Sequence, residues 1–479
     1  MQTFKQKTIS AFTWSLVDKF GQQVLTFVVG IVLARFYLSP ADYGLMGMLA
    51  IFIALSNILL DSGFGIAIIR KQELSQIELS SIYIFSIFLS LVLYSILFFC
   101  APLIASFYHQ PILVPLCRIS ALLILINAST NVQYNLFVKE LKFKYIYFAN
   151  ITSLSISLLI VIILARNGFG VWALIWQSII FVGIRNIIIW YDSSWRPSLT
   201  FSFTVIKSFW SFSSRVMITG TLNTIFNNVF SLLIGKFYPL REVGYFTQAN
   251  KFSDLTSGTI MSTIQSASYP ILSQINNDEE RLKRVYRKIV RVASFLSFPI
   301  LFGLAAISLP LVQVLLTNKW ISIVPYMQKL CIGGAFLPLV AININLMYVK
   351  GYSDKVLRLE LIRKAIITAC ILFSISLGVS ALITGLVISN ILGYLLSAYI
   401  SGKNTNYKVF DQLKDIGPYL IIASIMAISM YILSAYIANN LFLLPTQIVV
   451  GAAIYFSAVF ILGSKIFQEM LELLKINRN

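Results

Sequence analysis

The chain has 479 residues, of which 58% are hydrophobic and 11% are charged, and its formal net charge at pH 7 is +19. Ordinary soluble domains contain about 25% charged residues, so this composition excludes a soluble enzyme and indicates membrane-spanning helices. The Lys and Arg residues lie between apolar runs instead of forming a basic domain with interleaved aromatic residues, so no nucleic acid is expected as a partner. The four cysteines and the single histidine lack the spacing of a metal or redox site, and no metal or cofactor is expected.

Apolar runs that are long enough to cross a bilayer follow one another along the whole chain. A membrane-spanning helix needs about 20 mostly apolar residues, and charge clusters together with Gly and Pro divide the chain into about fourteen such runs. We therefore expect an all-α, polytopic membrane protein. In chain order the expected spans are 8–37, 42–69, 79–107, 112–138, 145–165, 171–190, 206–237, 242–275, 285–316, 321–349, 357–378, 379–400, 416–438 and 443–464.

The basic residues gather at alternate ends of these spans. Cytoplasmic loops carry an excess of Lys and Arg, so this bias predicts that both termini are cytoplasmic. The charged segment 276–288 either lies along the inner surface as an amphipathic helix or continues the ninth span into the cytoplasm. The ends assigned to the outer side hold only Arg35, Arg166, Lys236, Arg241 and Lys319.

Two short segments recur at a separation of about two hundred residues, which indicates an internal repeat. Residues 35–37 with Gly44 recur as 236–238 with Gly244, and residues 135–139 recur as 345–350. The equivalents lie six spans apart, so the two repeats enter the membrane in the same direction and form a parallel pseudo-repeat. This predicts an amino-terminal lobe of six spans in residues 1–200, a carboxy-terminal lobe of six spans in residues 201–402, and two further spans with a short cytoplasmic tail in residues 403–479.

Ionisable residues inside spans cost about 2.5–3.5 kcal/mol each on insertion scales and usually face a bundle interior or a hydrated cavity. Asp18, Gln22 and Thr26 follow one another at steps of four in the first span. Arg215, Thr219, Asn223 and Asn227 do the same in the seventh span, so each set forms a polar stripe on one helix face. Such stripes predict a hydrated cleft between the lobes, lined by spans one, two, seven and eight. The candidate substrate-binding residues are Arg215, Lys251, Lys19, Arg118, Asn223 and Gln22, and the candidates for ion coupling are Asp18, Asp61 and Asp254.

Arg215 is the strongest of these candidates because no carboxylate lies three or four residues from it. An arginine that faces a cavity suits a phosphate, since its planar guanidinium donates two hydrogen bonds and stays charged. The other positions have structural alternatives. Lys251 and Asp254 are one turn apart and could neutralise each other, and Asp18 could pair with a neighbouring cation. Lys19 and Arg118 lie near enough to span ends to reach the membrane surface.

Four stretches resemble the polysaccharide transporters, or Wzx-type oligosaccharide-lipid flippases, of the multidrug/oligosaccharidyl-lipid/polysaccharide (MOP) exporter superfamily. They are LLDSGFGIA at 59–67, FVKELKFK at 137–144, VGYFTQANK at 243–251 and YPILSQ at 269–274.

The resemblance implies a bacterial inner-membrane protein that works by alternating access. Its cargo would be an undecaprenyl-pyrophosphate-linked repeat unit, flipped outward for O-antigen, capsule or exopolysaccharide assembly, with a polysaccharide polymerase as a possible partner. Relatives that flip the peptidoglycan precursor hold its pyrophosphate with cavity arginines, and multidrug relatives use a carboxylate in span one for ion coupling. By region, the resemblance assigns these two roles to Arg215 and Asp18.

Two other functions compete with the flippase hypothesis. An ion-coupled multidrug antiporter of the same fold would favour carboxylates over cations inside the spans, whereas here the cations are the more numerous. A membrane polymerase or ligase would need a sizeable outer loop with acid and base groups, and every expected outer connection is short. We therefore expect a transporter and not an enzyme. The intramembrane cations are Lys19, Arg118, Arg215, Lys251 and Lys329, against Asp18, Asp61 and Asp254.

Overall fold

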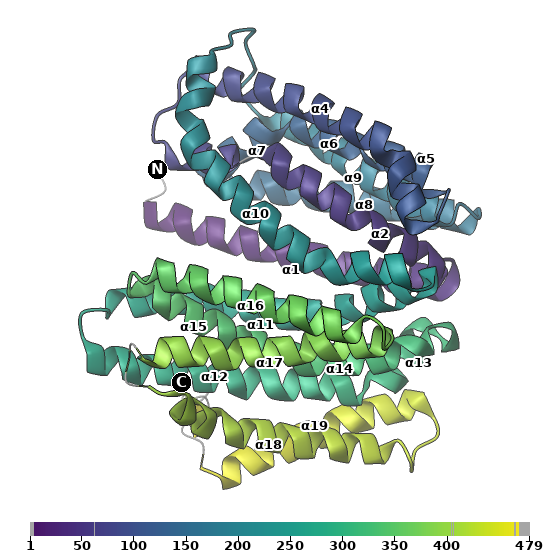
Figure 1. Cartoon of the computed structure of the whole chain (residues 1–479), viewed down its shortest axis with the longest axis vertical. Coiled ribbons are helices and arrows are strands. Elements are labelled where there is room, and N and C mark those ends of the chain that lie inside the picture. Colours follow the sequence, from purple (N-terminus) through teal and green to yellow (C-terminus); the bar gives the residue numbers. More distant parts are fainter. Residues whose placement is uncertain (1–3, 62, 404, 406, 464–465, 469–479) are drawn as a thin grey trace. The chain divides into compact units, whose positions relative to one another are not determined.

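The computed structural model describes residues 4–61, 63–403, 405, 407–463 and 466–468, and every regular element within these residues is an α-helix or a short 3-10 helix. The all-α, polytopic fold expected from the composition is confirmed. The first ten helices are α1 (Phe4–Phe36), α2 (Pro40–Asp61), α3 (Phe64–Arg70), α4 (Gln76–Tyr108), α5 (Leu113–Ser120), α6 (Leu122–Ala128), α7 (Asn131–Lys139), α8 (Phe143–Arg166), α9 (Val171–Asp192) and α10 (Phe203–Phe237) (Figure 1).

The second half of the chain continues the series. Its elements are α11 (Leu240–Gln274), α12 (Glu279–Ala306), α13 (Ser308–Leu316), the 3-10 helix η1 (Asn318–Ile323), α14 (Val324–Gly334), α15 (Leu337–Val349), α16 (Ser353–Ser374), α17 (Val379–Lys403), α18 (Val409–Leu433) and α19 (Asn440–Ile461).

In the described residues, eleven helices are long and apolar enough to cross a membrane, and the bent pair Leu113–Ala128 and Asn131–Lys139 makes a twelfth if it counts as one span. The other two expected spans correspond to α11 and α16, which are long enough but more polar. α16 carries charged side chains through its first half, from Asp354 to Lys364. The count of fourteen therefore stays a prediction, whereas the order of the apolar helices follows the expected series. Some bounds differ, since expected span nine is divided into α12 and α13, and expected span thirteen begins earlier, at Val409.

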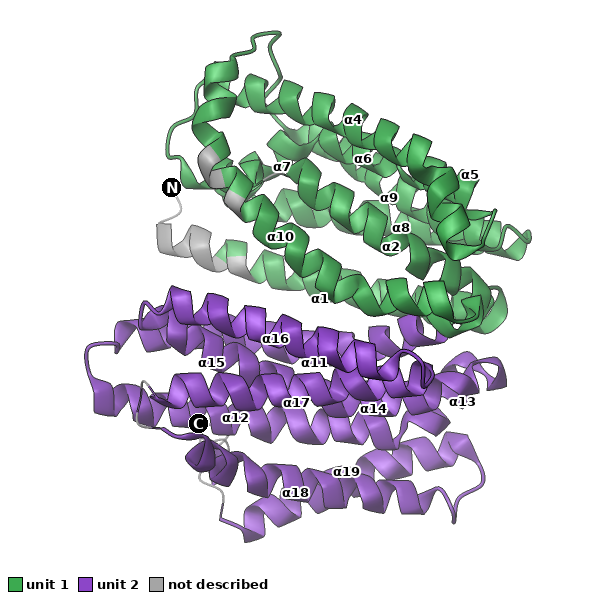
Figure 2. Ribbon diagram, viewed as in Figure 1, with its two compact units in different colours: residues 1–244 green, residues 245–479 purple. Residues whose placement is uncertain are grey.

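The helices gather into two compact units, residues 1–244 and 245–479 (Figure 2). In the first unit α8 packs against α1 and α9, and α10 packs against α2 and α4. These last contacts assign α10 to the first unit, so the division by contacts falls after residue 244. The boundary after residue 200, which was drawn from the sequence repeat, stays a prediction.

Spans four and ten, which are equivalents in the expected repeat, are both interrupted. In the first unit α6 ends at Ala128 and α7 begins at Asn131, with a bend of 47° between the two parts of the span. In the second unit α14 ends at Gly334 and α15 begins at Leu337 with Pro338 in its first turn, where the missing N–H of proline is tolerated. A break at equivalent positions supports the internal repeat.

The charged segment before span nine is part of that helix. α12 runs without interruption from Glu279 to Ala306, and the Asp278 side chain accepts a hydrogen bond of 2.9 Å from the backbone N–H of Arg281 at its start. Of the two alternatives drawn from the sequence, continuation of the span is confirmed and a separate surface helix is wrong.

Candidate functional site

The carboxylate of Asp18 lies between α1 and α8 in a shell of amide groups. It accepts hydrogen bonds from Gln22 Nε2 at 2.8 Å and from Asn150 Nδ2 at 3.1 and 3.3 Å, and Asp18 is only 9% exposed. The ring of Trp14 packs against Tyr147 of α8 with centroids 5.2 Å apart, which fixes the two helices together. Amide donors replace the water that a buried carboxylate loses. Amide groups therefore hold Asp18 directly, and no ion pair joins it to a cation among the described residues, although the charge of Lys19 is close enough to act on it.

A second polar site in the first unit is a cavity of about 150 Å³. It brings together Asn57 and Asp61 of α2, which the sequence places one turn apart, and side chains from the broken fourth span and α9. The lining residues are Asn57, Leu60, Asp61, Asn127, Thr130, Asn131, Tyr134 and Arg185. A carboxylate, several amides, a phenol and a guanidinium thus face one hollow.

Arg185 has hydrogen-bonding capacity to spare in this cavity. Its Nη2 donates to Asn127 Oδ1 at 2.8 Å, and Asn127 Nδ2 donates to Asn57 Oδ1 at 3.4 Å. The buried Arg185 Nε–H has no acceptor among the described residues, where Arg185 and Asp61 also form no ion pair. An arginine has five N–H donors, so this cavity can donate to a polar ligand as well as accept from one.

The cavity exists because α9 supports the break in span four. Asn186 Nδ2 donates to the Ile126 carbonyl, and Trp190 Nε1 donates to the Ser129 carbonyl at 2.9 Å. Thr130 Oγ1 in turn donates to Asn186 Oδ1 at 2.8 Å. Irregular backbone at membrane depth is tolerated only where protein or a cavity satisfies it. α9 therefore supplies both Arg185 and the groups that hold residues 126–130, which include the lining residues Asn127 and Thr130.

The backbone of Gly65 lies close to the Asp61 carboxylate and helps to fix its position. A Cβ added at Gly65 would lie 2.7 Å from Asp61 Oδ1 and 2.9 Å from the amide of Asn135, distances that real Cβ atoms essentially never show. The backbone N–H of Gly65 donates to the Asp61 carboxylate. A larger residue here would push the side chains of Asp61 and Asn135 away from their present positions, which gives a physical reason for glycine in the stretch 59–67.

The polar residues that follow Arg215 on α10 are exposed, and the hydrated cleft that they predict stays a prediction. Thr219, Asn223 and Asn227 are all exposed on this helix. Arg215 lies on the same helix one turn earlier, but its side chain lies outside the described residues. Its direction, and the phosphate role assigned to it, stay predictions.

The remaining candidates differ in their surroundings. Lys251 of α11 is half-buried and Asp254 is exposed, but no ion pair joins them in the described part of the chain. Asp254 instead accepts a hydrogen bond of 2.6 Å from Asn250 Nδ2. Lys19 is exposed on α1. The mutual neutralisation of Lys251 and Asp254, one of the alternatives drawn from the sequence, is therefore not seen.

Two other intramembrane cations bind neighbouring helices directly. Arg118 of α5 lies 4.2 Å from the centre of the Phe98 ring of α4, and its Nε donates to the Phe98 carbonyl at 3.3 Å. Lys329 of α14 donates to Ser380 Oγ at 2.6 Å and to Thr384 Oγ1 at 2.9 Å. These contacts join helices within each unit, and the substrate role expected for Arg118 stays a prediction.

Residues 32–325, more than half of the chain, match the family described as "Polysaccharide biosynthesis protein". The chain belongs to this family. Its membership of the polysaccharide-transporter branch of the MOP superfamily, expected from the four sequence stretches, is confirmed.

Two relatives and one solved structure are similar to this chain over two thirds of its length or more. The chain is 22% identical to the succinoglycan biosynthesis transport protein ExoT of Rhizobium meliloti (strain 1021), with 99% of this chain and 97% of that one covered. It is 24% identical to the lipopolysaccharide biosynthesis protein WzxC of Escherichia coli (strain K12), over 69% and 68% of the two chains. The fold is that of the lipid II flippase MurJ in an inward closed conformation, with a TM-score of 0.71, 16% identity, and 96% and 100% of the two chains covered.

Two residues of the candidate site, Arg185 and Asn150, were not predicted from the sequence. Arg185 is a single cation in the apolar run 171–190 with no carboxylate three or four residues away, the same signal that singled out Arg215. Asn150 is a single amide in the apolar run 145–165. Arg185 could have been found by that criterion, whereas the pairing of Asn150 with Asp18 depends on how α1 and α8 pack.

Proposed function

We propose that this protein flips an oligosaccharide repeat unit linked to undecaprenyl pyrophosphate across the bacterial inner membrane by alternating access. Family membership and the fold support this proposal, and the observation that carries it is the polar cavity around Arg185 and Asp61. The products served would be O-antigen, capsule or exopolysaccharide.

The cavity meets the physical requirement for moving a sugar through lipid. Hydroxyl groups taken into an apolar medium without hydrogen bonds cost several kcal/mol each. Arg185 lies seven residues before the end of α9 at Asp192, which places it about 10 Å inside the helix at a rise of 1.5 Å per residue. Donors and acceptors at this depth substitute for water, while the isoprenoid tail stays in lipid. Such transfer breaks no covalent bond, which fits a transporter and not an enzyme.

Charge provides both the recognition and the driving force. Arg215, Lys251, Lys19 and Arg118 are proposed to attract the pyrophosphate together with Arg185, and Asn223 and Gln22 to bind polar groups of the cargo. With a negative interior, moving an anion outward is favourable by about 2.3 kcal/mol per charge per 100 mV. Coupling to protons or sodium would act through the carboxylates Asp18, Asp61 and Asp254.

Accumulation of cargo tests this proposal. In a strain that lacks the protein, lipid-linked repeat units should accumulate on the inner leaflet and surface polysaccharide should fall, and both should recover when the intact chain is restored. Normal surface polysaccharide without accumulation would reject the flippase function, and efflux of cationic drugs instead would favour a multidrug antiporter.

A pair of variants tests the cavity itself. Arg185→Ala should reduce surface polysaccharide at least tenfold at normal expression, because the cavity loses its only cation among the described lining residues. Arg166→Ala, which removes the same charge from the exposed end of α8, should leave export unchanged. Equal export by the two variants would show that the cavity is not on the cargo path.

A further inference from the structure

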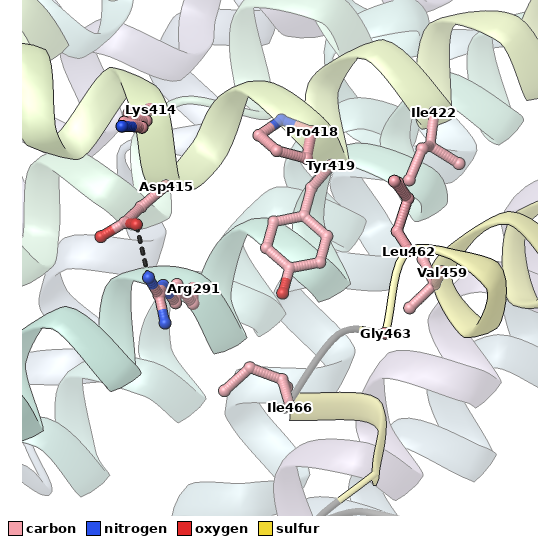
Figure 3. Close-up of a pocket in the computed structure, with 10 residues that line it drawn as sticks. All are labelled: Arg291, Lys414, Asp415, Pro418, Tyr419, Ile422, Val459, Leu462, Gly463 and Ile466. Atoms are coloured by element: carbon pink, nitrogen blue, oxygen red, sulfur yellow. Dashed lines mark hydrogen bonds and ion pairs between the residues drawn. The ribbon is translucent and has the colours of Figure 1, made fainter.

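The second unit contains a pocket of about 280 Å³ that shares no residue with the candidate site (Figure 3). Its walls come from α12, from the first turns of α18, and from the end of α19 with the residues that follow it. Polar side chains line one part and apolar side chains the other. The lining residues are Arg291, Lys414, Asp415, Pro418, Tyr419, Ile422, Val459, Leu462, Gly463 and Ile466.

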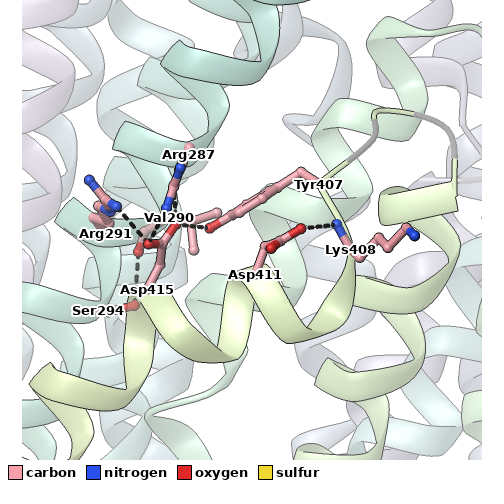
Figure 4. A network of polar contacts seen from close by, with 8 residues as sticks. All are labelled: Arg287, Val290, Arg291, Ser294, Tyr407, Lys408, Asp411 and Asp415. Carbon is pink, nitrogen blue, oxygen red and sulfur yellow. Dashed lines mark hydrogen bonds and ion pairs between the residues drawn. The ribbon is translucent and has the colours of Figure 1, made fainter.

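The polar part of this pocket is positively charged. Asp415 accepts hydrogen bonds from Arg291 Nη2 at 2.6 Å, from Arg287 Nη2 at 2.8 Å and from the Tyr407 hydroxyl at 2.7 Å (Figure 4). One carboxylate thus faces two guanidinium groups. Lys414 adds a third cation and is exposed with no partner among the described residues. Arg287, Arg291 and Lys414 outnumber the carboxylates Asp415 and Asp411 by one, so the cluster keeps an excess positive charge.

Arg291 and Lys414 have N–H groups at the pocket that the contacts of the described residues do not use. Arg291 uses one of its five N–H groups in the contacts of the described residues, its side chain is 32% exposed, and it lines the pocket. The ammonium of Lys414 offers three more donors. Arg and Lys are the residues that proteins use to bind phosphate, because each such hydrogen bond is assisted by charge.

The apolar part lies on the other side of these donors. Figure 3 shows Ile422, Val459 and Leu462 along one side of the pocket, with Tyr419 between them and Arg291. Lys414 is five residues after the start of α18 at Val409, or about 8 Å along the helix axis. Lys414 therefore lies near the start of a helix that is apolar enough to span a membrane, and the apolar wall lies farther along the same helix at Ile422.

We infer that this pocket binds one anionic phospholipid, with its phosphate on Arg291 and Lys414 and an acyl chain along Ile422, Val459 and Leu462. Basic pockets between membrane helices favour anionic lipid head groups. A free phosphate would leave the apolar wall uncovered, and a zwitterionic lipid would bring its own cation to a cationic cluster. The bound lipid would join α12 to α18 and α19, which pack side by side in this unit (Figure 1).

Native mass spectrometry and thermal unfolding of the full-length, detergent-purified protein test this inference. Phosphatidylglycerol should bind at least tenfold more tightly than phosphatidylcholine with the same acyl chains and should raise the unfolding temperature. Inorganic phosphate should neither raise the unfolding temperature nor displace the lipid. Equal binding of the two lipids, or equal stabilisation by phosphate, would overturn the inference.

Two variants, at the exposed Lys414 of α18 and at the exposed Lys408 just before this helix, locate the site. Lys414→Gln should weaken phosphatidylglycerol binding at least about tenfold, as expected for one charge-assisted hydrogen bond. Lys408→Gln removes the same charge from the start of the same helix, at a residue that does not line the pocket, and should bind like the intact protein. Leu462→Ser should reduce binding without changing the preference for the anionic lipid. Equal binding by both lysine variants would place the lipid elsewhere and overturn the assignment.

Discussion

The carboxylate of Asp415 offers a direct test of what holds α18 to α12. Its side chain is 4% exposed, and it is the common acceptor for Arg287, Arg291 and Tyr407. Asp415→Ala would leave two cations without their anion. Burial raises the pKa of Tyr407, so its phenol stays protonated at neutral pH and would keep a buried donor without an acceptor.

The size of the effect follows from these surroundings. Removing one partner of a fully buried ion pair costs about 3–5 kcal/mol. The side chains of Arg287 and Arg291 are 42% and 32% exposed, so water would solvate them in the variant and lower the cost. We expect a loss of about 2–4 kcal/mol. For a unit of this size, residues 245–479, that corresponds to a fall of roughly 4–8 °C in unfolding temperature.

Heating the detergent-solubilised protein, followed by size-exclusion chromatography with fluorescence detection, would measure this fall. The matched control is Asp411→Ala, one turn earlier on α18, where an exposed carboxylate accepts from the Lys408 backbone N–H at 3.1 Å. That variant should lose about 0.5–1.5 kcal/mol. If the two variants unfold at the same temperature, the network around Asp415 stabilises the protein no more than one exposed hydrogen bond, and the reasoning is wrong.

Three further predictions concern the first unit. Asn150→Ala removes a buried donor from Asp18 and should destabilise the protein by about 1–3 kcal/mol in the same heating assay, with Asn150→Asp worse because two carboxylates would then face each other. Gly65→Ala should abolish polysaccharide export at normal expression, since its Cβ would displace Asp61. Gly183→Ala on α9, where a Cβ meets nothing within 4 Å, should leave export intact and raise stability by up to about 1 kcal/mol; loss of export here would contradict the packing argument.

Much of the fold could be predicted from the sequence because lipid imposes a simple rule on it. A spanning helix must be apolar over about 20 residues, so the run of spans and the resemblance to a transporter family can be recognised without tertiary contacts. The same rule places helix ends wrongly where a charged residue inside a helix is paired with other protein groups. The thirteenth span was expected to start at residue 416, but α18 starts at Val409, because Asp415 is paired with arginines and can enter the bundle.

The site was less predictable because it depends on which helices meet. Polar stripes on single helices can be read from spacing, and Asn57 and Asp61 do face one cavity. The partners across that cavity come from a bend after Ala128 that places Asn127 beside Arg185, and no local pattern reports such a meeting. Arg118 gives a second example. It contacts the ring and the carbonyl of Phe98, and these contacts depend on how α5 packs against α4, which the sequence does not show.

The support that α9 gives to the interrupted span has a practical consequence for chimaeric proteins. The carbonyl oxygens of Ile126 and Ser129 receive their donors from Asn186 and Trp190, more than fifty residues later in the chain. A graft that exchanges residues 113–139 with a relative but keeps the resident α9 would strand these oxygens in a medium without water. A chimaera designed to transfer cargo preference between members of this family should therefore exchange residues 113–139 together with α9.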